Sequence, residues 1–132
     1  MAISNPVERQ YPLVARVYFA FADFSTTTTG VGIPAITLPV NSIVTKGDLV
    51  ILNAFDGTTP TLDVGDASSA ARYEGANDAT AAVVTPLTIT RFLTTGSEPS
   101  VELELTWTDT TTGDGYLEVE YVITGRGNEA QP

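Results

Sequence analysis

The side chains of this protein that could do chemistry are nearly all carboxylates. The 132 residues include sixteen Asp and Glu against six Lys and Arg, and they contain no His and no Cys. Without His the chain lacks the commonest general base and zinc ligand, and without Cys it has neither disulfides nor thiolate metal ligands. No GxSxG elbow or P-loop pattern surrounds its Ser and Thr residues. The composition therefore predicts a protein that is not an enzyme and carries no cofactor.

Four glutamates alternate with apolar residues between Ser100 and Thr124, on either side of a turn rich in Thr, Gly and Asp. They are Glu102, Glu104, Glu118 and Glu120. This period of two predicts two strands of an antiparallel hairpin, with the four carboxylates on one outward face. Like charges opposite each other destabilise a sheet by about 0.2–1 kcal/mol per pair. Either the face docks on a basic partner or a cation, or it is a solvated face that prevents aggregation.

Three aspartates fall within one turn, strand and turn: Asp56, Asp63 and Asp66. Oxygen-rich loops of this kind can hold calcium, but the spacing matches neither an EF-hand nor a nonapeptide calcium repeat. Asp is also a common turn residue because its side chain bonds to nearby backbone. We interpret the three as turn residues and predict no metal site.

Other candidate contact residues lie outside the strands. Arg72 and Tyr73 belong to side-chain types favoured at interfaces, and they fall in a long connection. The N-terminal segment carries Arg9, Tyr11 and Pro12, which we expect to contact a partner. The single tryptophan, Trp107, lies on the apolar side of the predicted hairpin, which indicates a place in the core.

The formal net charge of −10 bears on the partner. Phosphates would be repelled by such a chain, so the charge argues against nucleic acid and favours a basic protein. No apolar run is long enough to span a membrane, and no secretion signal is evident at the N-terminus.

The rest of the chain alternates between strand patterns and turn residues. Residues 13–24 predict a first strand that buries Leu13, Ala15, Val17, Phe19 and Phe21. Residues 33–40 carry two prolines and predict an edge strand. In residues 43–53, Gly47 makes either a bulge in one strand or a turn between two. Shorter strands are predicted at residues 61–64 and 83–93, and the connection at 67–82 predicts at most one helical turn.

Seven or eight strands with no alternation of strands and helices predict an all-β fold. We expect an antiparallel β-sandwich with jelly-roll topology. Residues 1–12 are predicted to form an extended arm, residues 13–124 the single sandwich domain, and residues 125–132 a C-terminal tail.

Two segments carry a resemblance to a known family. Leu38-Pro39-Val40-Asn41-Ser42-Ile43-Val44 leads into a strand, and AFDGTTPTLDVGD follows at residues 54–66. This pattern resembles the cement or decoration proteins that stabilise tailed-phage heads. The resemblance implies a jelly roll on the outside of a capsid shell, where it clamps neighbouring major capsid protein subunits, with assembly in the host cytoplasm. It implies no catalytic residues.

A small structural protein of this type gains from symmetric self-association, so we expect a homodimer or homotrimer. The arm through Pro12 is expected to pair with an edge of a neighbouring subunit. Whether the face that carries the four glutamates or the arm docks on the partner stays open at this point. The alternative function is that of a tail-fibre or tail-tip jelly roll that binds host carbohydrate, which would need an aromatic-lined cleft.

Overall fold

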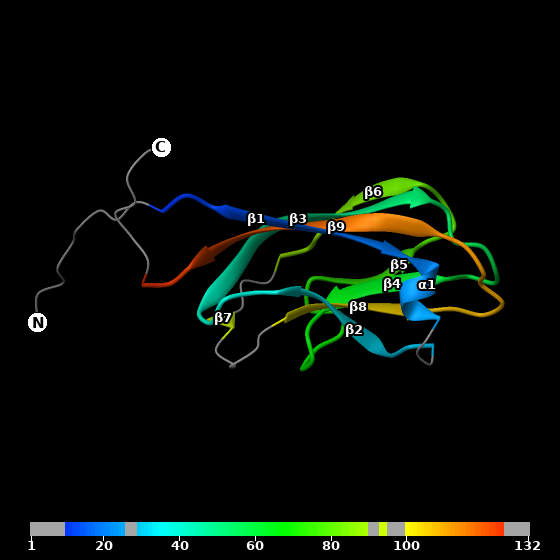
Figure 1. The fold of residues 1–132 in the computed structure, drawn as a ribbon, viewed down its shortest axis with the longest axis horizontal. Helices are drawn as coiled ribbons and strands as arrows, with labels where there is room; N and C mark the ends of the chain where they lie inside the picture. Colours follow the sequence, from blue (N-terminus) through cyan, green and yellow to red (C-terminus); the bar gives the residue numbers. More distant parts are fainter. Residues whose placement is uncertain (1–9, 26–28, 90–92, 95–99, 126–132) are drawn as a thin grey trace, which may run out of the picture.

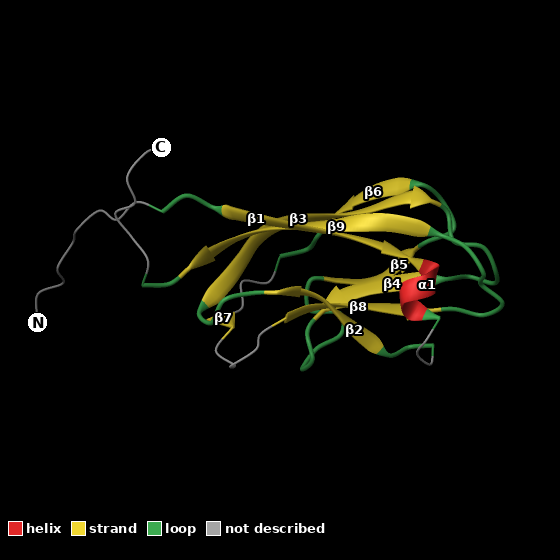
Figure 2. Cartoon of the chain, in the orientation of Figure 1, coloured by secondary structure: helices red, strands yellow, loops and turns green. Residues whose placement is uncertain are grey.

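The structure is a computed structural model that describes residues 10–25, 29–89, 93–94 and 100–125. Two antiparallel sheets face each other, as Figure 1 shows edge-on. Sheet A contains β1 (Leu13–Ala20), β3 (Ser42–Asn53), β6 (Val83–Pro86), β7 (Leu93–Thr94) and β9 (Asp114–Ile123). Sheet B contains β2 (Gly32–Thr37), β4 (Thr61–Gly65), β5 (Glu74–Asp78) and β8 (Ser100–Thr106). A single helical turn, α1 (Phe21–Phe24), lies at one end of the sandwich (Figure 2).

The order of the strands is that of a jelly roll. Sheet A runs β1-β9-β3-β6, with β7 paired to the start of β3, and sheet B runs β2-β8-β4-β5. The first strand therefore pairs with the last and the second with the last but one, as expected when a long hairpin wraps around a barrel-like core. The predicted all-β sandwich with jelly-roll topology is confirmed.

The core lies between the two sheets and takes one face of each strand. Its fully buried members include Val44, Leu62, Leu103, Leu117 and Val119, each 0% exposed. These residues sit at alternate positions along their strands, so the period of two in the sequence reports burial directly. Trp107 is half-buried and meets the Phe21 ring edge-on at 4.9 Å, and so packs against the core as predicted.

The first strand is shorter than predicted. Ala15, Val17 and Phe19 turn toward the core as expected, but β1 ends at Ala20 and α1 begins. The Asp23 carboxylate accepts a hydrogen bond from the Ala20 N–H at 2.8 Å, which caps the new turn. Phe21 and Phe24, three residues apart on that turn, both reach the core.

One long strand, β3, resolves the alternatives left open around Gly47. The strand is continuous from Ser42 to Asn53, and its register against β9 shifts between Val44 and Lys46, so the bulged residue is Thr45. Gly47 lies in the strand two residues later. A Cβ there would approach the Leu87 side chain to 2.6 Å, which explains why a residue without a side chain occupies the position.

The predicted hairpin between residues 100 and 124 is wrong. The two strands, β8 and β9, belong to different sheets: β8 pairs with β2 and β4, and β9 pairs with β1 and β3. Residues 107–113 therefore cross from sheet B to sheet A, and these seven residues are enough to join the two sheets. Each strand keeps its predicted alternation, but their outward faces lie on opposite sides of the molecule.

Two further segments differ from expectation. Residues 67–82 hold no helical turn and instead form a turn followed by the edge strand β5, where Ala76 has a positive φ of 52°. The strand predicted at residues 83–93 is divided into β6 and β7, and residues 90–92 lie outside the described part. The edge position predicted for the proline-bearing segment is confirmed by β2, whose register shifts after Pro34.

Among the described residues, the structure contains no helix with the length and apolar character needed to cross a membrane.

Candidate partner-binding surfaces

The described residues form no cluster suited to metal binding. Groups of three or more Asp and Glu side chains placed to hold a metal are absent from the described residues. The three aspartates considered as calcium ligands have separate positions and each bonds to nearby backbone. The molecule therefore presents surfaces, and the question is which of them fits a partner.

The strands of sheet B turn an acidic face to solvent. Glu102 and Glu104 point outward from β8, and Asp63 on β4 lies directly opposite Glu104. Partial burial, and then the charges of Asp63 and Glu102, raise the pKa of Glu104. The four strands of this sheet contain no Lys or Arg. We call Asp63, Glu102 and Glu104 the acidic face.

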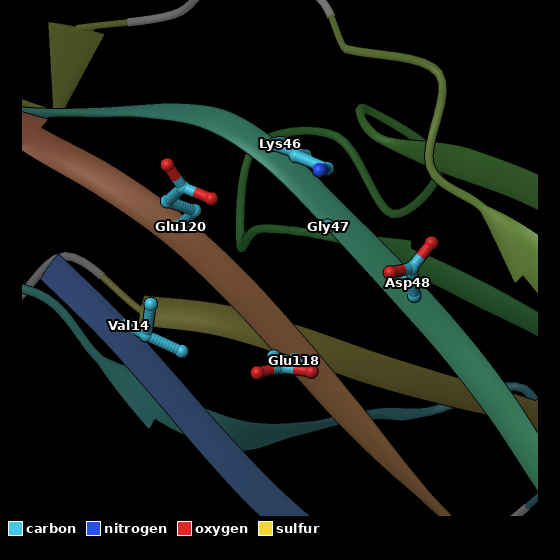
Figure 3. Close-up of a pocket in the computed structure, with 6 residues that line it drawn as sticks. All are labelled: Val14, Lys46, Gly47, Asp48, Glu118 and Glu120. Carbon is cyan, nitrogen blue, oxygen red and sulfur yellow. The ribbon is translucent and has the colours of Figure 1, made fainter. Parts of the chain in front are cut away.

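The outward face of sheet A carries both signs of charge. Glu118 and Glu120 point outward from β9, but each has a cation beside it in the register. Arg16 on β1 lies opposite Glu118 and bonds to it at 3.1 Å, and Lys46 on β3 lies opposite Glu120. Asp48 lies opposite Glu118 on the other side of β9, and Lys46, Asp48, Glu118 and Glu120 line a shallow pocket of about 130 Å³ (Figure 3). We call Arg16, Lys46, Asp48, Glu118 and Glu120 the mixed-charge face.

An aromatic and aliphatic row borders the mixed-charge face. Across sheet A, Tyr18, Tyr116, Val50 and Val84 occupy adjacent register positions. The Tyr18 and Tyr116 rings lie 5.4 Å apart, and the Arg16 guanidinium sits 4.5 Å above Tyr116. Val50 is 6% exposed although it is no member of the core cluster, because its neighbours in the row cover it.

The two candidate contact residues in the long connection, Arg72 and Tyr73, instead make contacts within the fold. Tyr73 is 1% exposed and packs in the core, so its ring is not presented to a partner. Burial raises the pKa of its hydroxyl. Arg72 forms an ion pair with Asp66, and both side chains are largely buried. Asp66 also accepts bonds from the N–H groups of Ser68 and Ser69.

The arm candidates lie at the boundary of the described chain. Arg9 is outside the described residues. Tyr11 is half-buried and Pro12 is exposed, immediately before β1. The Gln10 amide donates to the Ile123 carbonyl at 2.7 Å and accepts from the Ile123 N–H, which fastens the chain to the end of β9.

The predicted site residues are therefore divided among separate surfaces. Glu102 and Glu104 share the acidic face, while Glu118 and Glu120 belong to the mixed-charge face on the other side. Sequence reasoning missed Arg16, which forms an ion pair with Glu118, and Lys46, which lies opposite Glu120 in the register. A signal did exist for Arg16, since it alternates with the buried positions of the first strand, but the opposite strand could not be read from the sequence.

Comparisons with known proteins identify the fold. No protein-family model and no curated protein matches the sequence. A chain from the capsid asymmetric unit of cyanophage Pam1 is similar in structure, with a TM-score of 0.64 and 23% identity over 93% of this chain and 94% of that chain. A chain from the acid-stable capsid of Helicobacter pylori bacteriophage KHP30 gives a TM-score of 0.67 and 17% identity over 96% and 100% of the two chains. At these identities the likeness is one of fold.

Proposed function

We propose that this chain is a structural virion protein of a phage head. It acts as a decoration or cement protein that binds the outside of the shell and clamps neighbouring major capsid protein subunits. The observation that supports this most is the match of the whole jelly roll to chains in two phage capsids. Because almost the full length is covered on both sides, those chains are proteins of about the same size.

The physical character of the molecule suits such a role. A well-packed sandwich resists deformation, and its described residues offer no catalytic cluster. The charge of −10 favours a basic protein surface over nucleic acid. We propose the shell, together with further copies of this chain, as the partners, and assembly in the host cytoplasm.

The acidic face is the better candidate for docking on the shell. Its carboxylates lie side by side without a cation on any strand of sheet B, at a cost in repulsion of about 0.2–1 kcal/mol per opposed pair. A basic partner would relieve that repulsion. On the mixed-charge face, Arg16 forms an ion pair with Glu118 and Lys46 lies opposite Glu120 in the register, so a basic partner gains less there.

The N-terminal arm, residues 1–12, is proposed as a second contact. An extended segment can pair with a sheet edge on a neighbouring subunit, where main-chain hydrogen bonds supply affinity. Gln10 bonds to Ile123, which fastens the start of the described chain to the end of β9.

Binding to shells that lack this protein tests the proposal. Purified shells are mixed with wild type, with Glu102→Gln/Glu104→Gln, or with the matched control Glu118→Gln/Glu120→Gln, and sedimented. We expect wild type to co-sediment, the first double variant to bind at least tenfold more weakly, and the control to bind nearly as well as wild type. Removal of residues 1–12 should leave a folded domain that binds poorly.

Failure of the wild-type protein to co-sediment with shells would contradict the proposed function itself. Equal loss of binding by both double variants would instead contradict the assignment to the acidic face. Unchanged occupancy after removal of the arm would eliminate the arm as a contact.

A further inference from the structure

Apart from the two-residue strand β7, the described sandwich has four edge strands, and they differ in how well they could accept another strand. β2 contains Pro34, which has no N–H, and its register shifts beside that residue. β5 is distorted by the positive φ of Ala76, whose N–H is bonded to Asp63. β6 has four residues and ends with Pro86. Edges of these kinds are protected against the addition of a strand.

β1 is the exception among the edges that the structure describes. Its eight residues contain no proline, and all of them pair with β9 without a register shift. Along an antiparallel pair, alternate residues turn their N–H and C=O groups toward the partner or away from it. The Phe21 N–H bonds to the Gly113 carbonyl on the β9 side, and the Ala20 N–H bonds to Asp23 instead. By this alternation the backbone groups of Val14, Arg16 and Tyr18 face the open edge.

The side chains along this edge are exposed and almost free of negative charge. Val14 and Tyr18 are 59% and 63% exposed, among the highest values for large apolar side chains in the described chain. β1 carries one charge, that of Arg16, and no carboxylate. In a chain with a net charge of −10, this is an edge where a second copy meets little direct repulsion.

We propose that two copies of this chain associate through β1, antiparallel about a twofold axis, so that sheet A continues from one copy into the other. The alternation of faces permits a register with Val17 opposite Val17 of the second copy. That register places Arg16 opposite Tyr18 of the second copy twice, a favourable cation and aromatic pairing. Sliding one strand by two residues would instead bring Arg16 opposite Arg16.

A second feature at the same edge supports this partner. A pocket of about 310 Å³ opens between β1 and β2, lined mostly by apolar side chains, among them Val17, Phe19, Ile33 and Leu103, together with Tyr18 and the carboxylate of Asp23. In the proposed register the twofold axis passes beside Val17, at the mouth of this opening. The second copy would cover it, which removes further apolar surface from water.

This inference deepens the self-association proposed above and does not depend on binding to a shell. Sedimentation equilibrium of the full chain over a range of concentrations measures it. The test variant is Arg16→Pro, which removes an N–H from the open edge and leaves the backbone hydrogen bonds with β9 intact, although it also removes the ion pair with Glu118. Its matched control is Val84→Pro on β6, at the other edge of sheet A. Val84 has the same alternation as Pro86, so its N–H also faces away from its neighbour.

We expect a monomer–dimer equilibrium for wild type and Val84→Pro, and a dimer at least tenfold weaker for Arg16→Pro. Circular dichroism and a cooperative melt confirm that both variants are folded. A wild type that stays monomeric, or an Arg16→Pro variant that dimerises as well as the control, would overturn the proposal. Neither result would contradict the proposal of shell binding, which is tested separately.

A cysteine introduced at the twofold axis tests the register itself. The chain has no Cys, so any disulfide in Val17→Cys joins two copies. Directly opposed residues of a non-hydrogen-bonded pair have Cα atoms about 4.5 Å apart, within the range that a disulfide spans. We expect a covalent dimer on oxidation of Val17→Cys and none from Thr85→Cys on β6. A dimeric Val17→Cys protein that does not crosslink would overturn this register.

Discussion

Asp56 shows how a single carboxylate fixes the connection between the two sheets. It accepts bonds from the Thr111 N–H and hydroxyl, both at 2.6 Å, and from the Thr112 N–H at 2.9 Å. These bonds hold the crossing segment, residues 107–113, against the loop that follows β3. The Thr111 hydroxyl and the two N–H groups lower the pKa of Asp56 to about 2. Asp66 accepts bonds from the N–H groups of Ser68 and Ser69, as expected of a turn residue, whereas Asp63 lies in β4 and accepts a bond from the Ala76 N–H on the neighbouring strand.

Replacement of Asp56 should destabilise the protein in a way that depends on pH. A carboxyl group whose pKa is depressed in the folded state adds stability above its unfolded value of 3.8, and that stability is lost as the pH falls through about 2. We expect Asp56→Asn to lower the melting temperature by a few degrees at pH 7. The difference from wild type should shrink steadily as the pH falls from 4 to 2.

Thermal melts of the two proteins between pH 2 and pH 7 measure this difference. Asp109→Asn, in the same crossing segment, is the control and should show no such trend. A gap between Asp56→Asn and wild type that stays constant down to pH 2 would mean that the ionised carboxylate is not the group that stabilises the loop.

Individual residues could be placed on a face from the sequence, but not given neighbours. The alternation of Glu102, Glu104, Glu118 and Glu120 with apolar residues correctly predicts that all four point outward. The charge that lies beside each glutamate depends on the neighbouring strands. For β9 these are β3 and β1, whose residues Lys46 and Arg16 come about 70 and 100 positions earlier in the chain. Tyr73 illustrates the opposite error, because a tyrosine in a connection gives no local sign that the turn folds its ring into the core.

At the scale of elements, strands were easier to predict than their partners. Strand patterns at β2, β3, β4, β8 and β9 follow from the period of two. The pairing of β8 with β9 did not, since hairpin formation was inferred from adjacency alone. A two-residue turn would have required a hairpin, whereas the seven residues 107–113 are also enough to change sheets. The one-turn helix α1 depends on Asp23 capping Ala20, which interrupts an otherwise strand-like pattern.

Gly113, at the end of the crossing segment, is predicted to be essential for the junction with β9. Its φ of 143° is rarely adopted by residues with a side chain, and a Cβ there would lie 2.3 Å from the buried Phe55 ring. Both backbone strain and overpacking oppose a substitution. We expect Gly113→Ala to lower the free energy of unfolding by about 3 kcal/mol or more.

Gly125→Ala separates the two effects. Gly125 also has a positive φ, of 82°, but a Cβ there meets nothing within 4 Å. Strain alone should cost about 1–2 kcal/mol. Urea unfolding of both variants gives the comparison, and equal losses of stability would show that the Phe55 ring moves aside without cost.

The whole molecule has two outward faces of different electrostatic character. Sheet B presents the acidic face, sheet A presents the mixed-charge face, and the edge strand β1 has no carboxylate. The class of fold and its topology could be predicted from strand count and from the resemblance, because they reflect the pattern of the entire chain. The difference between the faces could not, because it arises when non-local pairing brings Arg16 and Lys46 beside β9 and leaves β8 beside Asp63.

The two proposed interfaces should therefore respond to salt in opposite directions. Docking of the acidic face on a basic shell is an attraction between unlike charges, which salt screens, since the Debye length falls from about 10 Å at 0.1 M to about 3 Å at 1 M. Association of two copies through β1 brings together chains of like net charge, and screening reduces their mutual repulsion. We expect shell binding to weaken and dimerisation to strengthen as NaCl rises from 0.05 to 0.5 M, a range over which the Debye length falls about threefold. Co-sedimentation with shells and sedimentation equilibrium of the free protein measure the two responses. A parallel response in both assays would show that one surface serves both contacts, and would contradict their assignment to different parts of the sandwich.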